Sequence, residues 1–337
     1  MTMQMYITLS EEDRIARYEV GEDTGALTHI GDTATAARPA PLAVNPTGDR
    51  LYVGCRDAIA ISTFAIGDGG ALAHIGDAAV ENDPCYLSTD RAGRFLLSAY
   101  YEGGRCAVHA IGDDGAAVSP PVEWLATDKG AHSMQTDPAN RFAFVPHISG
   151  GNGPNAIFQF RFDAETGHIT PNTPARVTPD AELGPRHFCF HPHKDILYFS
   201  DEQGCSVTAY NFDADAGTLS AFQTTSTLPD GYDGQNSCSQ IQIAPSGEFL
   251  YAPNRGHNSI ACFSVDAHSG ALTPIGHAAS EAVPRAFSID PTGQYLYAAG
   301  LDTGKLAAYR IEDDGTLARI ATYDVGEGPM WVLLIGD

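Results

Sequence analysis

The sequence predicts an all-β protein folded as a seven-bladed β-propeller. An apolar strand, a turn of the type Asp/Asn-Pro-x-Gly or a close variant, and an aromatic-rich strand recur six times. Steps of 45, 47, 54, 53 and 46 residues separate the turn anchors of these copies, Pro46, Arg91, Pro138, Pro192, Pro245 and Pro291. Each step is about the length of a four-stranded blade. No segment keeps a period near 3.6 residues, so few helices are expected.

Both halves of the repeated unit predict strands. The first half gives two strands in each of six copies, at 44–54, 88–100, 135–147, 190–202, 243–255 and 289–300. In the second half an alternating strand ends in an acidic-Gly turn and leads to a short last strand, as in STFAIGDGGALAHIG at 62–76. Such turns between alternating segments are typical of β-hairpins.

The two ends of the chain supply the seventh blade. MYITL, IARYEV and LTHIG near the N-terminus predict three strands, and GPMWVLLIG at 328–336 predicts the innermost one. Pairing of the N-terminal strands with the C-terminal strand closes the ring and removes exposed sheet edges. We therefore expect one domain, residues 1–337.

Composition restricts the partners and the compartment. The net charge is −23, from 42 acidic and 19 basic side chains, which disfavours nucleic acid and anionic membrane surfaces. No apolar run is long enough for a membrane span, and MTMQMYITLSEEDR does not resemble a secretory signal. Seven cysteines without a CxxC pair indicate a reducing compartment, so we expect a cytoplasmic protein. The oligomeric state is left open.

The hairpin GPRHFCFHPHKDILYFSDE, residues 184–202, indicates where chemistry is located. Antiparallel strands return to the same sheet edge, so Arg186 and Glu202 are expected on one rim. In a propeller, loops that enter the innermost strands and leave the second strands form the mouth of the central channel. Entry loops contribute Arg38, Pro84, His132, Arg186, Asn236, Ser239, Arg285, Met330 and Trp331. Exit loops contribute Arg56, Tyr100, Tyr101, His147, Asp201, Glu202, Asn254, Arg255, His257 and Asp302.

Four of these mouth residues form the predicted catalytic group: His132, Arg186, Glu202 and Arg255. Two arginines suit a carboxylate, a phosphate or a developing oxyanion, and a histidine with a carboxylate offers a base and an acid. Each also has a structural interpretation, such as a bridge between Arg186 and Glu202, a histidine holding a loop carbonyl, or a solvated turn arginine. The long Gly-rich segments 146–155 and 224–238 are expected near the same mouth.

A metal site is not predicted. His132, His147, His187, His191 and His193 resemble a pool of ligands, but His191 and His193 flank the turn at the opposite end of the hairpin and are expected at the surface. The mouth contains no HxH or HExxH pattern. No Gly-rich phosphate loop or nucleophile elbow is present, so neither a nucleotide cofactor nor covalent serine chemistry is expected.

Several motifs resemble a known family. The segments GPRHFCFHPH and YFSDE, with AHSMQTDPANRFAFVP, YAPNRGHNSI, VPRAFSIDPTGQYLYAAG and GPMWVLL, resemble the propeller lactonases, which include bacterial 6-phosphogluconolactonases and a fungal carboxymuconate cyclase. The resemblance implies the same catalytic group, with the histidine in AHS, the arginines in GPR and PNRG, and the glutamate after YFSD. That glutamate is commonly preceded by Asn, whereas Asp201 precedes it here. A second carboxylate there could raise the pKa of Glu202 and favour an acid role.

The leading hypothesis is a lactone hydrolase for a small anionic sugar lactone, and the resemblance implies 6-phosphogluconolactone or a related aldonolactone. His132 or Glu202 would activate water, while Arg186 and Arg255 hold the anionic group or the oxyanion. The predicted substrate-binding residues are Arg285, His187, Asn236 and Trp331. Two alternatives stay open: a muconate cycloisomerase that closes a lactone, and a non-catalytic propeller that binds proteins.

Overall fold

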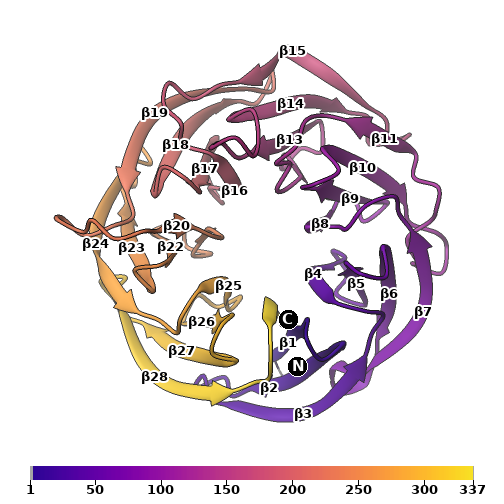
Figure 1. The fold of residues 1–337 in the computed structure, drawn as a ribbon, viewed down its shortest axis with the longest axis horizontal. Coiled ribbons are helices and arrows are strands. Elements are labelled where there is room, and N and C mark those ends of the chain that lie inside the picture. Colours follow the sequence, from indigo (N-terminus) through magenta and orange to yellow (C-terminus); the bar gives the residue numbers. More distant parts are fainter. Residues whose placement is uncertain (1–2, 337) are drawn as a thin grey trace.

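Seven antiparallel sheets surround a central channel in the computed structural model, which describes residues 3–336 (Figure 1). From the channel outward, three sheets contain β4 (Pro39–Val44), β5 (Arg50–Cys55), β6 (Ala60–Ile66) and β7 (Leu72–Ala79); β8 (Tyr86–Thr89), β9 (Phe95–Tyr100), β10 (Arg105–Ala110) and β11 (Glu123–Ala126); and β12 (Gln135–Thr136), β13 (Phe142–His147), β14 (Ala156–Phe162) and β15 (Ile169–Val177). The next three contain β16 (Pro185–Phe190), β17 (Ile196–Asp201), β18 (Ser206–Asp213) and β19 (Thr218–Ser226); β20 (Ser237–Cys238) and β21 (Gln242–Ile243), then β22 (Phe249–Arg255), β23 (Ser259–Val265) and β24 (Leu272–Ala279); and β25 (Pro284–Ile289), β26 (Tyr295–Gly300), β27 (Lys305–Ile311) and β28 (Leu317–Asp324).

The seventh sheet joins the two ends of the chain. Its order is β29 (Pro329–Ile335), β1 (Met3–Leu9), β2 (Arg14–Val20) and β3 (Leu27–Ala34), with β29 innermost (Figure 1). Antiparallel pairing runs from Gln4 opposite Ile335 to Leu9 opposite Pro329. This confirms the predicted seven-bladed propeller and its closure. Residues 1–2 and 337 of the predicted domain lie outside the described residues, and the single-domain assignment stays a prediction.

Helical structure is nearly absent, as expected. Within residues 3–336 the one helical element is the 3-10 turn η1 (Asp68–Gly70). None of the helical segments in the described part has the length and apolar character needed to span a membrane.

A buried aspartate shapes three of the six repeated turns, at Asp90, Asp137 and Asp290. Asp137 is 1% exposed, and its Oδ1 accepts hydrogen bonds from the backbone N–H groups of Arg141 (2.6 Å) and Phe142 (2.7 Å). Asp90 makes the equivalent bonds in the preceding blade, at 2.7 and 2.8 Å. A buried carboxylate costs free energy unless it is hydrogen-bonded, so these residues bind their own turn and fix the start of the second strand.

Neighbouring blades pack through apolar side chains and through tyrosines. Apolar clusters fill the space between adjacent sheets, as where Tyr251, Phe287 and Leu296 meet. In five of the seven blades a second-strand tyrosine also donates a hydrogen bond to a glycine carbonyl in the next blade: Tyr6 to Gly70, Tyr52 to Gly115, Tyr198 to Gly270, Tyr251 to Gly315 and Tyr297 to Gly25. These contacts fix each blade relative to its neighbour.

The turn at His191 differs from the prediction in one respect. His193 is exposed, but His191 is 5% exposed and therefore buried. Its ring lies against Gly247 in the corresponding turn of the next blade, where a Cβ would come within 2.8 Å of it. The expectation that both histidines are at the surface is therefore wrong for His191, because the turns of adjacent blades pack against one another.

Candidate active site

β-Bulges aim side chains into the mouth of the channel. In β16 the register with β17 shifts between Pro185 and His187, which leaves Arg186 as the extra residue. The same shift occurs in β25 after Pro284, where Arg285 is the extra residue. A bulge turns a side chain out of the normal alternation of a strand and is common next to active sites. The repeated Pro-Arg pair therefore places two guanidinium groups at the inner strand entrances.

Arg186, Glu202 and Arg255 form one ion-paired group. The Nε of Arg186 donates to Oε2 of Glu202 at 2.6 Å, and the Nη2 of Arg255 lies 3.2 Å from Oε1 of the same carboxylate. Arg255 also donates to the backbone oxygen of Cys238 at 2.6 Å. The ion pair between Arg186 and Glu202, one of the structural interpretations considered from the sequence, is thus present. The contact of Arg255 with the same carboxylate joins two of the three blades that carry the predicted catalytic residues.

Burial makes this group electrostatically unusual. The side chain of Arg186 is 2% exposed, and its Nη1 has no hydrogen-bond partner among the described residues. Burial lowers the pKa of Arg186 to about 10, against the opposing effect of Glu202. Burial alone would raise the pKa of Glu202, but the charges of Arg186 and Arg255 hold it below its usual value.

The idea that Asp201 raises the pKa of Glu202 is wrong. The carboxylate of Asp201 points into its own blade, where its Oδ2 accepts hydrogen bonds from Ser206 and Thr208, each at 2.7 Å. Burial raises the pKa of Asp201 itself to about 7. Glu202 lies in the turn after β17 and pairs with Arg186 and Arg255, so the two carboxylates have different partners.

His132 and His187 form the second part of the site. Nδ1 of His132 and Nε2 of His187 share a hydrogen bond of 3.3 Å, and both side chains are buried. Burial, followed by the positive charges of Arg186 and Arg285, lowers the pKa of both imidazoles well below 6.5. Both histidines are therefore neutral at pH 7, and in the tautomer in which Nδ1–H of His132 donates to His187, Nε2 of His132 can accept a proton.

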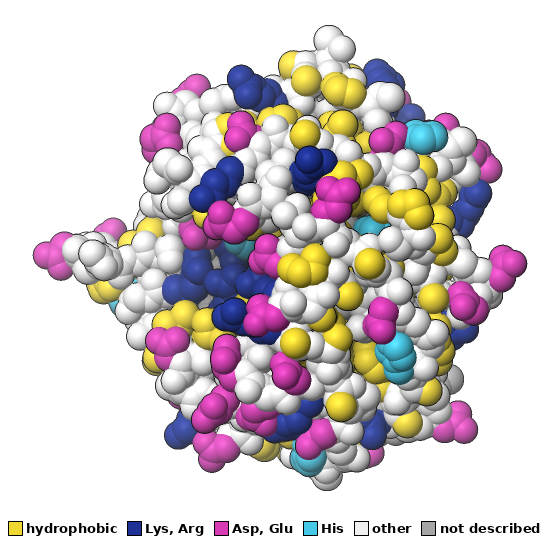
Figure 2. All heavy atoms as spheres, turned by 45° about the vertical axis from the view of Figure 1, so that its right-hand side comes forward, with side chains coloured by type: hydrophobic (Ala, Val, Ile, Leu, Met, Phe, Trp, Pro, Cys, Tyr) yellow, Lys and Arg dark blue, Asp and Glu magenta, His cyan; other side chains and the backbone are white. Residues whose placement is uncertain are grey.

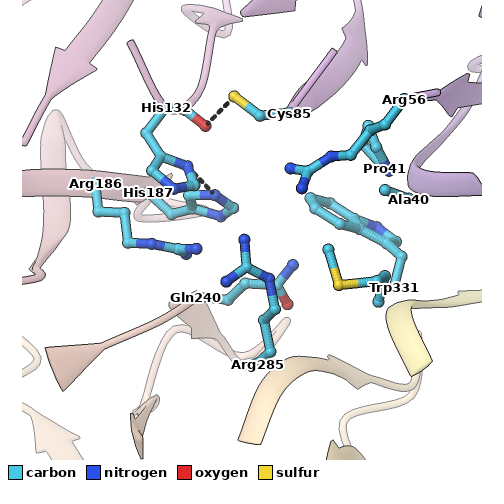
Figure 3. A pocket seen from close by; sticks show the side chains of 11 residues that line it. Ala40, Pro41, Arg56, Cys85, His132, Arg186, His187, Gln240, Arg285 and Trp331 are labelled. Carbon is cyan, nitrogen blue, oxygen red and sulfur yellow. Dashed lines mark hydrogen bonds between the residues drawn. The ribbon is translucent and has the colours of Figure 1, made fainter. Parts of the chain in front are cut away.

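These side chains surround a narrow cavity in which arginines approach from three sides (Figure 3). Its lining contains no acidic side chain and consists of Ala40, Pro41, Arg56, Cys85, His132, Arg186, His187, Gln240, Arg285, Met330 and Trp331. Figure 2 shows Lys and Arg side chains gathered in a hollow of a surface that elsewhere carries many Asp and Glu side chains. The geometry suits a small anionic ligand.

The predicted residues do not all face this cavity. The cavity is lined by His132, Arg186, His187, Arg285 and Trp331. Glu202 lies behind this lining and pairs with Arg186, and Arg255 pairs in turn with Glu202. Asn236 is elsewhere: its Nδ2 donates to Oδ1 of Asn254 at 2.9 Å, and its Oδ1 accepts the N–H of His257 at 3.1 Å. The structure thus gives Asn236 a loop-holding position and does not bring it to the cavity.

The sequence prediction missed Arg56 and Gln240 as cavity residues. Arg56 is among the predicted mouth residues but not in the predicted catalytic or binding set, although it follows the exit of β5 much as Arg255 ends β22. Gln240 lies on the inner edge of its blade, two residues before Gln242 of β21. The alternation of side chains along that inner strand could have indicated Gln240, but the strand is interrupted between β20 and β21, which hides the alternation.

The two long loops lie at this mouth as expected. The backbone N–H of Ser149 donates to Oε1 of Gln203, the neighbour of Glu202, at 3.1 Å. Beyond the second loop, the N–H of Cys238 donates to the oxygen of Glu202 at 3.1 Å. Within residues 3–336 no group of three or more His, Cys, Asp or Glu side chains is arranged to hold a metal ion, and the absence of a cofactor stays a prediction.

Fold and site together define a β-propeller whose ionisable side chains converge on a small-molecule pocket at one end of its channel. The family model described as Lactonase, 7-bladed beta-propeller matches residues 4–334. The chain belongs to this lactonase family, which confirms the resemblance identified from the motifs.

Named relatives agree along the whole chain. A 6-phosphogluconolactonase of Pectobacterium carotovorum subsp. carotovorum is 34% identical over 336 residues, 99% of each chain. One of Yersinia pestis is 31% identical over 337 residues, 100% of this chain and 99% of the relative. The solved structure of a periplasmic gluconolactonase from Pseudomonas aeruginosa has a TM-score of 0.91 at 22% identity, covering 100% and 99% of the two chains, which supports the fold.

Proposed function

We propose that this protein hydrolyses a sugar lactone, with 6-phosphogluconolactone as the leading substrate. The observation that carries the proposal is the acid-free pocket of three arginines and two neutral histidines. Family membership and relatives named 6-phosphogluconolactonase support the same reaction. A carboxylic acid and a sugar hydroxyl are the products of adding water across the ester bond of the ring.

Arg186 stabilises the transition state in this proposal. Its partnerless Nη1 is buried and offers a donor to the oxygen that becomes negative when water attacks the lactone carbonyl. Glu202 accepts from Nε and holds the guanidinium in place. Because both oxygens of Glu202 engage arginines, the carboxylate acts as a positioning group rather than as the acid or base.

His132 is the proposed general base. When its Nδ1–H donates to Nε2 of His187, its Nε2 keeps a lone pair that takes a proton from water. The water oxygen bonds to the carbonyl carbon and the ring C–O bond then breaks. The departing ring oxygen receives the proton held on His132, which returns to its neutral form.

A substrate panel tests the proposal directly. Purified protein is incubated with 6-phosphogluconolactone, glucono-δ-lactone and other aldonolactones, and acid release is followed after subtraction of spontaneous hydrolysis. We expect turnover of at least one sugar lactone, unchanged by chelator. Absence of turnover on every lactone would contradict the proposal.

Cycloisomerisation of a muconate is the second candidate, because the arginine-rich lining also suits a substrate with several carboxylates. Loss of ultraviolet absorbance of carboxymuconate measures this reaction. Conversion of carboxymuconate without lactone hydrolysis would replace the first proposal by the second.

We also propose a cytoplasmic location. The seven cysteines, among them Cys85 in the cavity, are all free, as is usual in a reducing compartment. Cell fractionation with an antibody against the protein tests this, and recovery outside the cytoplasmic fraction would contradict it.

A further inference from the structure

Two arginines of the cavity have no acidic partner. Within residues 3–336, the side chain of Arg285 makes no hydrogen bond or ion pair, although it points into the cavity (Figure 3). Arg56 faces it from another blade, and its one side-chain hydrogen bond is from Nε to the oxygen of Pro84 at a long 3.4 Å. Arginines without a partner are costly when partly buried, so a ligand anion at this position would stabilise them.

The charges divide the site into two parts. Arg186 and Arg255 share the carboxylate of Glu202, so that group has a net charge of 2 − 1 = +1. Arg56 and Arg285, which form no ion pair within residues 3–336, add two positive charges on another side of the cavity. A phosphate monoester carries a charge of about −1.5 to −2 at pH 7. The charge of Arg56 and Arg285 together is therefore opposite to that of a phosphate monoester and similar in size.

Several cations act on Arg285. The pKa of Arg285 is lowered to about 9, first by burial and then by the charges of Arg186, Arg255 and Arg56, against the opposing effect of Glu202. Gln240 adds a neutral donor: its Oε1 accepts the N–H of Phe287 at 3.0 Å, which leaves its amide NH₂ for the cavity. Donors without an acceptor are what a phosphate group requires.

We propose that Arg56 and Arg285, with the amide of Gln240, bind the phosphate group of the substrate, while Arg186 acts at the lactone carbonyl. This assignment rests on the proposed lactone hydrolysis. It makes Arg56 and Arg285 specificity residues that distinguish a phosphorylated sugar lactone from the unphosphorylated one. Bidentate arginine pairs are well suited to this discrimination.

The ratio of kcat/KM for 6-phosphogluconolactone to that for glucono-δ-lactone tests the assignment. We expect Arg56→Gln and Arg285→Gln each to lower kcat/KM for the phosphorylated lactone by about 10- to 100-fold, since each removes charge-assisted hydrogen bonds. Activity on glucono-δ-lactone should fall by a smaller factor, because that substrate has no phosphate to lose, so the ratio of the two kcat/KM values should fall. Arg285→Lys keeps the charge but not the planar fork, so its kcat/KM for the phosphorylated lactone should lie between those of wild type and Arg285→Gln.

Arg38→Gln is the matched control. Arg38 is also a rim arginine, but it is 51% exposed and pairs with Glu11 and Asp57 at 3.9 and 3.6 Å. Its loss removes the same charge from the same end of the channel and should leave the ratio unchanged. Circular dichroism of each variant confirms that it folds.

A binding measurement separates this inference from the proposed function. Calorimetric titration with 6-phosphogluconate and with gluconate needs no turnover. We expect the wild type to bind 6-phosphogluconate more tightly than gluconate. The double variant Arg56→Gln/Arg285→Gln should bind the two acids with equal affinity. Equal binding of the two acids by the wild type, or an unchanged kcat/KM ratio in both variants, would overturn the assignment even if the protein hydrolyses lactones. Failure of every lactone assay with a preserved preference for 6-phosphogluconate would overturn the hydrolysis alone.

Discussion

Individual side chains set the protonation states on which the proposed chemistry depends. Glu202 is held ionised by two guanidinium groups, whereas Asp201, its neighbour in sequence, is buried with two hydroxyl donors and has a raised pKa of about 7. Two adjacent carboxylates thus have opposite properties because Asp201, the last residue of β17, bonds to hydroxyls of its own blade, whereas Glu202, in the turn that follows, pairs with Arg186 and Arg255.

Replacing Asp201 by Asn should change how stability depends on pH. Since the pKa of Asp201 is raised from 3.8 to about 7 on folding, its contribution is greatest below pH 3.8 and is lost as pH rises to 7. The amide introduced by the substitution does not titrate, and its oxygen can still accept from Ser206 and Thr208. Between pH 5 and pH 8 the free energy of unfolding of Asp201→Asn should rise relative to wild type by about 2 to 3 kcal/mol. Urea unfolding at both pH values measures this. A difference in free energy of unfolding between variant and wild type that is the same at both pH values would contradict it.

The acid limb of the activity profile should lie well below pH 6.5. Burial and the charges of Arg186 and Arg285 lower the pKa of His132, so the base stays unprotonated in mildly acidic solution. A plot of kcat/KM against pH reports this pKa for the free enzyme. Arg285→Gln removes a positive charge and should move the limb to higher pH. A wild-type limb with its midpoint at or above pH 6.5 would be inconsistent with His132 as the base.

At the residue scale the sequence correctly predicted that Arg186 and Glu202 lie together, because hairpin geometry alone brings strand ends to one edge, while their catalytic roles stay a prediction. It did not predict that Asn236 turns away from the cavity, since the direction of a loop side chain depends on partners such as Asn254 that are distant in sequence. Gln240 was missed because the interruption between β20 and β21 hides the alternation of the inner strand. Spacing locates a backbone position, whereas the direction of the side chain follows from packing.

At the element scale, strands and turns follow from local chemistry that is visible in the sequence. The Asp/Asn-Pro-x-Gly turns and the alternating strands are both confirmed. The bulges that aim Arg186 and Arg285 were not predicted, because a shift of register depends on the partner strand.

The tyrosine contacts between blades should contribute measurably to stability. Tyr251 is fully buried and donates to the oxygen of Gly315 at 2.9 Å. Tyr251→Phe leaves that carbonyl without this donor and should lower the free energy of unfolding by about 1 to 2 kcal/mol. Phe144 occupies the same repeat position in another blade, so the ring without a hydroxyl is compatible with the fold. Chemical unfolding with an activity control tests this. An unchanged stability would show that the contact is not stabilising.

At the scale of the whole molecule, the C-terminal strand closes the ring and supplies part of the site. β29 pairs with β1, and its Trp331 lines the cavity. The repeat length predicted the number of blades, but the sequence could not show the narrow cavity, which depends on side chains from several blades.

Removing residues 328–337 should open the ring. The exposed edge of β1 then favours association between chains, and contacts with both neighbouring blades are lost. We expect a lower melting temperature and association detected by light scattering. Trp331→Ala, which keeps the strand, is the control and should stay monodisperse if wild type is. A truncated chain with wild-type melting behaviour would contradict the role of closure.

Hydrolysis of 6-phosphogluconolactone by wild type and Arg186→Ala tests the central claim most directly. Arg186 is the buried donor proposed for the oxyanion, and removal of one such donor typically lowers kcat by about 100- to 1,000-fold. We expect a loss of at least that size in a variant whose circular dichroism matches wild type. A folded Arg186→Ala protein that keeps kcat within about threefold of wild type would contradict the assignment of the site.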